Sequence, residues 1–213
     1  VWTFYAKEVR RFAKVALQTV IAPMVTTLLF LAIFTLALGG AAKTIAGIPY
    51  ASFLMPGLVM AAIMQNAFAN TSSSVLISKI QGNIVDVLMP PLTAGELTVG
   101  YALAGMTRGI AVAVATVFSL WLFVPVSLPV PWAAVVFGFS GSLLMSLIGL
   151  ITGVWSEKFD HVAVVTNFVV MPLAFLSGTF YSVEALPPFW SRLAHWNPFF
   201  YLSDGFRYGC IGH

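Results

Sequence analysis

The stretch Phe175–Arg207, FLSGTFYSVEALPPFWSRLAHWNPFFYLSDGFR, decides the class of this fold. An apolar segment without charged residues stops at Ser177-Gly178, and a short proline-broken segment follows it. That segment carries amphipathic aromatic rings suited to the depth of lipid headgroups, namely Trp190, Trp196, Phe199 and Tyr201. A buried helix of a soluble protein has no reason to end in this way, whereas a membrane-spanning helix does. The stretch therefore predicts a helical membrane protein.

The composition of the whole chain supports the same class. Hydrophobic residues make up 60% of the 213 residues and charged residues only 8%, against roughly 25% charged in ordinary soluble domains. The segments 15–42, 44–78, 109–156 and 161–183 contain no Asp, Glu, Lys or Arg. Each can hold a bilayer span, which needs about 20 apolar residues. The net charge of +3 comes mainly from basic residues at the edges of these segments, so we expect no nucleic-acid partner.

These segments predict an all-α membrane protein with one transmembrane domain over residues 1–213. We expect five spans, at about residues 17–38, 53–76, 97–123, 132–155 and 162–180. No apolar segment with a cleavage site precedes the first span, so we expect that span to be retained. The single cysteine, Cys210, excludes an intrachain disulfide and a cysteine-based metal cluster.

Residues 1–16 predict an amphipathic helix that lies in the membrane interface ahead of the first span. Its apolar residues recur at spacings of three, four and three: Trp2, Tyr5, Val9 and Phe12. Basic residues fall on the other face: Lys7, Arg10, Arg11 and Lys14. The alternative is that this segment simply continues the first span. Both interpretations place it on the cytoplasmic side.

The distribution of Lys and Arg predicts that the N-terminus is cytoplasmic, because cytoplasmic loops carry the excess of these residues. In that orientation six of them are cytoplasmic: Lys7, Arg10, Arg11, Lys14, Lys79 and Lys158. Three are on the outer side: Lys43, Arg192 and Arg207. Five spans then leave His213 outside as well.

The opening stretch resembles the signature of the permease subunits of type-2 ABC transporters. Three features carry the resemblance: the small-residue stop Ser177-Gly178, the pair Leu186-Pro187, and the sequence Pro198-Phe-x-Tyr201-x5-Arg207. The sequence departs from the family's pattern at Val170 and Thr179. The resemblance implies a membrane bundle of six spans, with the sixth span beyond this sequence, and an extracellular re-entrant segment over residues 181–207.

The resemblance also implies partners. Permeases of this kind mostly export their cargo, and two identical or related subunits form the pathway in the bacterial inner membrane. ATP and Mg²⁺ are bound by a separate ATP-binding subunit, so we expect no cofactor in this chain. Residues 181–207 would then form an extracellular gate; the alternative is a segment that only closes the outer edge of the bundle.

The loop at 77–96 is where the resemblance places the main coupling helix, which would lie in a groove of the ATP-binding subunit. Ile80, Ile84, Val87 and Leu88 can form one face of a short helix that ends before Pro90-Pro91. The alternative is a helix packed on its own bundle. The residues expected at the contact are Lys79, Gln81, Asn83, Asp86, Val87, Leu88 and Glu96.

Polar residues inside the spans are further candidates. Gln65, Asn66 and Asn70 lie in the second span, where buried amides either join helices or line a pathway. Arg108 lies in the third span, and ionisable residues at such positions are functional candidates. We expect it to form a structural ion pair, ahead of a contact with cargo, with one of the carboxylates Asp86, Glu157 and Asp160.

The outer segment predicts one short helix, at Val183–His195. We expect this helix to bury four apolar residues, Leu186, Phe189, Trp190 and Leu193, and to direct Glu184 and Arg192 towards water.

The sequence contains no Gly-x4-Gly-Lys-Ser/Thr phosphate loop and no nucleophile–base constellation, so we expect no enzymatic activity and no ATP hydrolysis by this chain. The acidic residues and histidine at 157–161 are expected to form a solvated turn. A secondary transporter or channel without an ATPase partner is the main alternative. A membrane-embedded enzyme and a helper subunit that binds partners without transporting cargo are the others.

Overall fold

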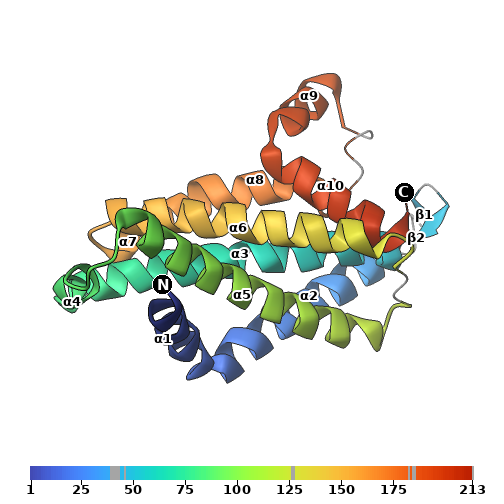
Figure 1. The fold of residues 1–213 in the computed structure, drawn as a ribbon. Helices are drawn as coiled ribbons and strands as arrows, with labels where there is room; N and C mark the ends of the chain where they lie inside the picture. The colour runs from blue at the N-terminus through green and yellow to red at the C-terminus, as the bar shows by residue number, and fades with distance from the viewer. Residues whose placement is uncertain (39–43, 46, 126–127, 182, 184–185, 213) are drawn as a thin grey trace.

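The computed structural model describes residues 1–38, 44–45, 47–125, 128–181, 183 and 186–212. They form an elongated helical bundle with one small hairpin (Figure 1). In chain order the elements are α1 (Trp2–Ala13), α2 (Ala16–Leu38), β1 (Thr44–Ile45), β2 (Ile48–Pro49), α3 (Tyr50–Ile80), α4 (Ile84–Leu88), α5 (Ala94–Trp121), α6 (Pro131–Trp155), α7 (Phe159–Val165), the π-helical turn η1 (Thr166–Val170), α8 (Met171–Leu176), α9 (Pro188–Trp196) and α10 (Pro198–Ile211). The end of the bundle that carries α4 is called the loop end, and the opposite end the hairpin end (Figure 1).

Five helical stretches are long and apolar enough to cross a membrane. They are Leu17–Ala37, Tyr50–Ile80, Ala94–Trp121, Pro131–Trp155 and Phe159–Leu176. The predicted all-α membrane fold and its five spans are therefore confirmed. Lys43 and Glu184, to which the sequence assigned positions outside the membrane, are not among the described residues.

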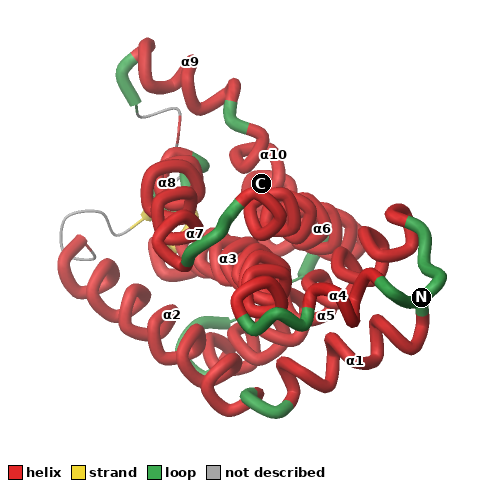
Figure 2. Tube along the Cα trace, turned by 90° about the vertical axis from the view of Figure 1, so that its left-hand side faces the viewer, coloured by secondary structure: helices red, strands yellow, loops and turns green. Residues whose placement is uncertain are grey.

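Helix α3 is the centre of the bundle. Figure 2 looks along the bundle and shows the other long helices around α3. The most apolar window of α3 is 72% buried, whereas those of α2 and of the fifth stretch are each 11% buried. Helices α3, α5, α6 and α10 thus form a closely packed core. Helix α2 and the fifth stretch lie at its side and are only lightly packed against it.

Small residues allow α3 and α6 to approach closely. A Cβ atom on Gly149 would overlap the carbonyl oxygen of Phe68 and the hydroxyl of Thr71. The Thr71 hydroxyl in turn donates a hydrogen bond of 2.8 Å to the Ser146 carbonyl oxygen. Small side chains and cross-helix hydrogen bonds of this kind drive the association of helices in lipid, where apolar surface alone gives no preference.

Local chemistry explains where two of the helices begin or end. The Thr93 side chain accepts from the backbone of Glu96, and the Glu96 carboxylate accepts from the backbone of Thr93 at 2.8 Å. This capping box starts α5 earlier than the hydrophobic pattern indicated. At the end of α6, Lys79 Nζ donates to the carbonyl oxygens of Val154 at 2.7 Å and Ser156 at 2.5 Å. A cation at this position also complements the helix dipole.

The fifth stretch is not one continuous α-helix. Between α7 and α8 the chain makes the π-helical turn η1, in which the N–H of Met171 bonds to the carbonyl of Thr166. Pro172 follows at once and has no N–H to donate, so the regular hydrogen-bond pattern is interrupted at this point.

The outer segment contains two helices instead of the single helix expected at Val183–His195. Helix α9 projects from the side of the bundle, while α10 returns along α6 towards the hairpin end (Figures 1 and 2). The expectation that α9 buries its apolar residues is wrong for this chain taken alone. Phe189, Trp190 and Leu193 are 71%, 50% and 43% exposed. Helix α10 was not predicted, because its glycines and polar residues weaken the apolar pattern.

Candidate functional site

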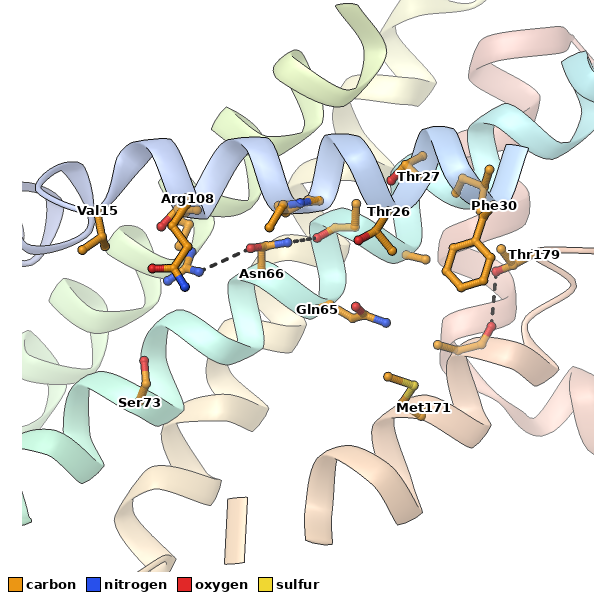
Figure 3. Close-up of a pocket in the computed structure, with 18 of the residues that line it drawn as sticks. Val15, Thr26, Thr27, Phe30, Gln65, Asn66, Ser73, Arg108, Met171 and Thr179 are labelled. Carbon is orange, nitrogen blue, oxygen red and sulfur yellow. Dashed lines mark hydrogen bonds between the residues drawn. The ribbon is translucent and has the colours of Figure 1, made fainter. Parts of the chain in front are cut away.

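A cavity of about 840 Å³ lies between the two lightly held parts of the bundle. Its walls are α2, the middle of α3 and α8, and Arg108 reaches into it from α5. In Figure 3, Arg108, Val15 and Ser73 lie at one end, Asn66 and Gln65 in the middle, and Phe30 and Thr179 at the other end. The arginine thus lies at one end of the cavity, and an aromatic ring lies among threonines at the other.

The polar end is built around Asn66 and Arg108. The Asn66 side chain donates to the carbonyl of Ala62 at 3.0 Å, which directs its oxygen towards Arg108. Arg108 Nη2 donates to that oxygen at 3.4 Å, a long bond, and Arg108 Nε has no partner among the described residues. Gln65 lines the same cavity and is exposed to it.

The carboxylate partner expected for Arg108 is absent from the described part of the chain. No Asp or Glu oxygen there lies within 4.0 Å of this guanidinium, since the two ion pairs found there involve Arg11 and Arg207. The reason is geometric. Asp86 lies in α4, Glu157 in the turn before α7 and Asp160 at the start of α7, all at the loop end. Arg108 lies at the middle of α5.

Asn70 has a different role from Gln65 and Asn66, because it holds α1 against α3. It is 1% exposed and does not line the cavity. Arg11 Nη2 donates to both the carbonyl and the side-chain oxygen of Asn70, each at 3.0 Å. Arg11 Nε also lies 3.1 Å from the Glu8 carboxylate. Glu8 is 2% exposed and accepts from the Ser74 hydroxyl at 2.5 Å.

This contact corrects the expected position of Arg11 on the exposed basic face of α1. The face that packs on the bundle carries Phe4, Glu8 and Arg11, at helical spacings of four and three. Trp2, expected on the apolar face of an interfacial helix, does not pack on the bundle and is 76% exposed. Arg10 and Lys14 do point outwards, as expected of an interfacial helix, whereas Arg11 points inwards. The burial of Glu8, the one acidic residue of the helix, was not predicted.

Substitution Glu8→Gln is expected to weaken the docking of α1 by about 1–3 kcal/mol, because it leaves Arg11 without its charge partner in a half-buried position. Hydrogen exchange of the α1 amides should become faster in the variant. Lys7→Gln is the matched control, since Lys7 is an exposed neighbour on the same helix. Equal protection of α1 in both variants would show that the Glu8 contacts do not hold the helix.

The signature residues of the outer segment meet inside the bundle. Arg207 is 6% exposed, and its Nη2 donates to the Gly178 carbonyl at 2.7 Å. Its guanidinium lies 4.2 Å from the ring centroid of Phe53. Asp204 is the nearby acid, at 3.8 Å. Arg207 is therefore not the free outer charge that the count of basic residues assumed.

The other signature residues begin the two outer helices or lie exposed on them. Pro187 is the residue before α9, and Pro198 is the first residue of α10. The intervening Asn197 caps α10 and donates to the Leu173 carbonyl at 2.6 Å, which joins the segment to α8. Leu186 is half-buried and Tyr201 is 55% exposed.

Helix α4, at the loop end, buries one side and exposes the other. Val87 is 4% exposed and packs in a small cluster with Phe4, Val75 and Tyr101. Ile84 is half-buried. Four other apolar residues in and beside the turn face outwards, with exposures of 53% for Ile80, 56% for Val85, 62% for Leu88 and 76% for Met89. Gln81, Asn83 and Asp86 are also exposed.

Comparison with known proteins identifies the family of this chain. The sequence profile of the ABC-2 type transporter family matches residues 1–211. The chain belongs to this family. It is 37% identical to the inner membrane transport permease YadH of Escherichia coli K12, over 99% of this chain and 82% of that protein. It is 26% identical to nodulation protein J of Rhizobium leguminosarum bv. trifolii, over 94% of this chain and 77% of that protein. No solved structure matched the chain.

In this ABC-2 type chain, three of the residues expected at the coupling contact make contacts within the chain instead. Lys79 caps α6, Glu96 completes the capping box of α5, and Val87 is buried. The residues of the original set that stay exposed are Gln81, Asn83, Asp86 and Leu88. Val85 and Met89 were missed, because the expected helical face ran through Ile84 and Val87 and excluded them.

No group of three or more metal-ligating side chains occurs in the described segments of this family member. In the turn at 157–161 the backbone N–H of Glu157 donates to His161 Nδ1 at 3.3 Å. This bond closes a short exposed turn and leaves no clustered acid–histidine site.

Proposed function

We propose that the chain is the membrane permease subunit of an ATP-driven exporter in the bacterial inner membrane. Two such subunits, identical or related, would form the pathway, and a separate subunit would bind ATP and Mg²⁺. One observation carries the proposal most directly. The same helix, α3, lines the polar cavity with Gln65 and Asn66 and continues without a break to the exposed turn at α4.

A second subunit is expected on the side where the cavity lies. There α2 and the fifth stretch leave most of their surface uncovered, and the cavity between them is partly open. A second copy on this side would close the cavity into a pathway between the subunits. The relatives named as transport permease and nodulation protein support a transport role but leave the cargo of this chain open.

The loop end is proposed to be cytoplasmic. Lys7, Arg10, Lys14 and Lys158 are all exposed, on α1 or near the turn before α7. Arg207 is buried, so among the described basic residues only Arg192 remains exposed beyond the fifth span. Among the described residues, four exposed Lys and Arg side chains on α1 or near the turn before α7 thus stand against one beyond the fifth span, and this bias favours a cytoplasmic loop end.

The exposed turn at α4 is the proposed contact with the ATP-binding subunit. Leu88 and Met89 form its apolar tip, and Asp86 supplies a charge beside them. Short helices that insert apolar side chains into a groove are a recurrent mode of recognition. Movement of the ATP-binding subunits would displace this turn and, with it, the α3 helix that lines the cavity.

Asp86→Lys and Leu88→Glu are expected to weaken binding of the ATP-binding subunit by about tenfold or more, because each alters a central exposed residue of the contact. The measurement is co-purification in mild detergent with the ATPase subunit, with ATP turnover as the second readout. Arg192→Glu is the control, because it reverses an exposed charge on α9. It should leave binding of the ATPase subunit and ATP turnover unchanged. Glu96 is unsuitable for this test, since its loss would also remove the cap of α5.

Unchanged ATP turnover in both loop variants would disprove the assignment of the contact. If the folded permease formed no complex with a soluble ATPase subunit at all, the exporter proposal would fail. The main alternative, a secondary transporter or channel, would then be preferred.

A further inference from the structure

The charges around the cavity do not balance. Arg11 and Arg108 both line it, so two positive charges lie at its wall. The charge of Arg11 is met by Glu8 at 3.1 Å. Arg108 has no carboxylate within 4.0 Å in the described segments. One positive charge at the polar end of the cavity is therefore left without a counter-charge.

The hydrogen-bonding capacity of Arg108 is also unused. Its Nε has no acceptor among the described residues, and its only side-chain bond is the 3.4 Å contact with Asn66. A guanidinium away from bulk water is costly unless it is paired. Its planar set of donors fits a carboxylate or a phosphate group in a two-pronged arrangement. The exposed amide of Gln65 offers a further donor on the same wall.

The depth of Arg108 fits a lipid-type headgroup. It sits at the middle of α5, but the Tyr5 hydroxyl of α1 lies 2.9 Å from the hydroxyl of the preceding residue, Thr107. Figure 3 shows Arg108 at the same end of the cavity as Val15, just before α2 begins. Amphipathic helices such as α1 lie at the boundary between headgroups and acyl chains. Arg108 is thus expected near that boundary and not at the centre of the bilayer.

The far end of the cavity suits an apolar group. Phe30 and Met171 lie towards it, together with Thr26, Thr27 and Thr179 (Figure 3). The Phe180 ring lies 5.9 Å from that of Phe30 and 5.5 Å from that of Phe175. The cavity is partly open at the side of the bundle, where a molecule could enter from the membrane. A ligand that satisfied both ends would have an anionic head and an apolar body.

We propose that the cavity binds an amphipathic molecule with an anionic phosphate or carboxylate head, held by Arg108 and oriented by Gln65 and Asn66. This inference names the chemical class of the cargo and so rests on the exporter proposal. It also makes a claim about binding that stands without the ATP-binding subunit, and that claim can be tested separately.

The test uses the whole permease in phosphatidylcholine nanodiscs and two single-chain probes of equal chain length, lysophosphatidic acid and lysophosphatidylcholine. The wild-type protein is expected to bind the anionic probe about tenfold more tightly, and added salt should reduce the difference. Arg108→Gln should remove this preference, whereas Arg108→Lys should keep most of it. Arg192→Gln is the matched control, because Arg192 is exposed on α9 away from the cavity.

A second variant keeps the test decisive if Arg108→Gln fails to fold. Asn66→Asp would place a carboxylate beside the intact guanidinium and is expected to abolish the preference by supplying the missing counter-charge. A carboxylate-headed probe of the same length separates the two anion types: equal preference for both anionic probes supports the general claim, and preference for one identifies the head.

Equal binding of the anionic and zwitterionic probes by the wild-type protein would overturn the inference. So would a preference that survives in both Arg108→Gln and Asn66→Asp. Selective binding without any ATPase complex would instead uphold the cavity assignment while refuting the exporter proposal. An active ATPase complex without selective binding would uphold the exporter proposal while refuting the cavity assignment.

Discussion

Arg207→Ala is expected to lower the free energy of unfolding by about 3–5 kcal/mol, the largest effect of any single substitution considered for this protein. The change removes the donor of the 2.7 Å bond to the Gly178 carbonyl and the stacking on Phe53, and it leaves a void in a region that is almost fully buried. The thermal unfolding midpoint in detergent should fall by about 10 °C or more.

Arg192→Ala is the control, because that arginine is exposed on α9 and its loss should change stability by less than about 0.5 kcal/mol. The loss of stability in Arg207→Lys should lie between those of the two alanine variants, since lysine keeps the charge but cannot reproduce the planar contact with the ring. Equal unfolding midpoints for the two alanine variants would mean that Arg207 does not join the outer segment to the bundle.

Gly149→Val is expected to cost about 3 kcal/mol, the second largest effect, because it separates the two helices that form the core. The added side chain would overlap the backbone of Phe68, which cannot move without shifting α3, as well as the hydroxyl of Thr71. The thermal unfolding midpoint and the yield of monodisperse protein should both fall.

Gly95→Val is the matched control on another helix. A Cβ atom at Gly95 would meet nothing closer than 3.9 Å, so the same substitution there should change stability by less than about 0.5 kcal/mol. If the two valine variants unfolded at the same temperature, close contact between α3 and α6 would not be a main source of stability.

The spans could be predicted from the sequence because they follow from a local property, the length of an uncharged apolar segment. The ends of the helices were less predictable. The capping box at Thr93 and Glu96 starts α5 ahead of its apolar pattern, although this motif is readable in the sequence. Helix α10 was missed because its stability comes from glycines that pack against α6, such as Gly209 against Ala134, and not from apolar periodicity.

The site was only partly predictable, because it depends on which helices lie side by side. Gln65 and Asn66 were recognised as pathway or packing residues, but nothing local distinguishes them from Asn70, which binds Arg11 instead. Likewise the sequence cannot show that Arg108 lies far from every turn with a carboxylate. Glu8 was overlooked because a single acid in a basic helix looks like part of its exposed face.

The interruption at Thr166–Val170 has a mechanical consequence for the protein. Helix α3 connects the loop end to Gln65 and Asn66 as a single rod of 31 residues. The turn before α7 is connected to Met171 and Phe175 through the π-helical turn ahead of Pro172, where the regular hydrogen-bond pattern is interrupted. If α4 binds a moving partner, we expect its displacement to pass along α3 to one wall of the cavity, and a displacement beside α7 to bend the fifth stretch at the π-helical turn before it reaches the opposite wall.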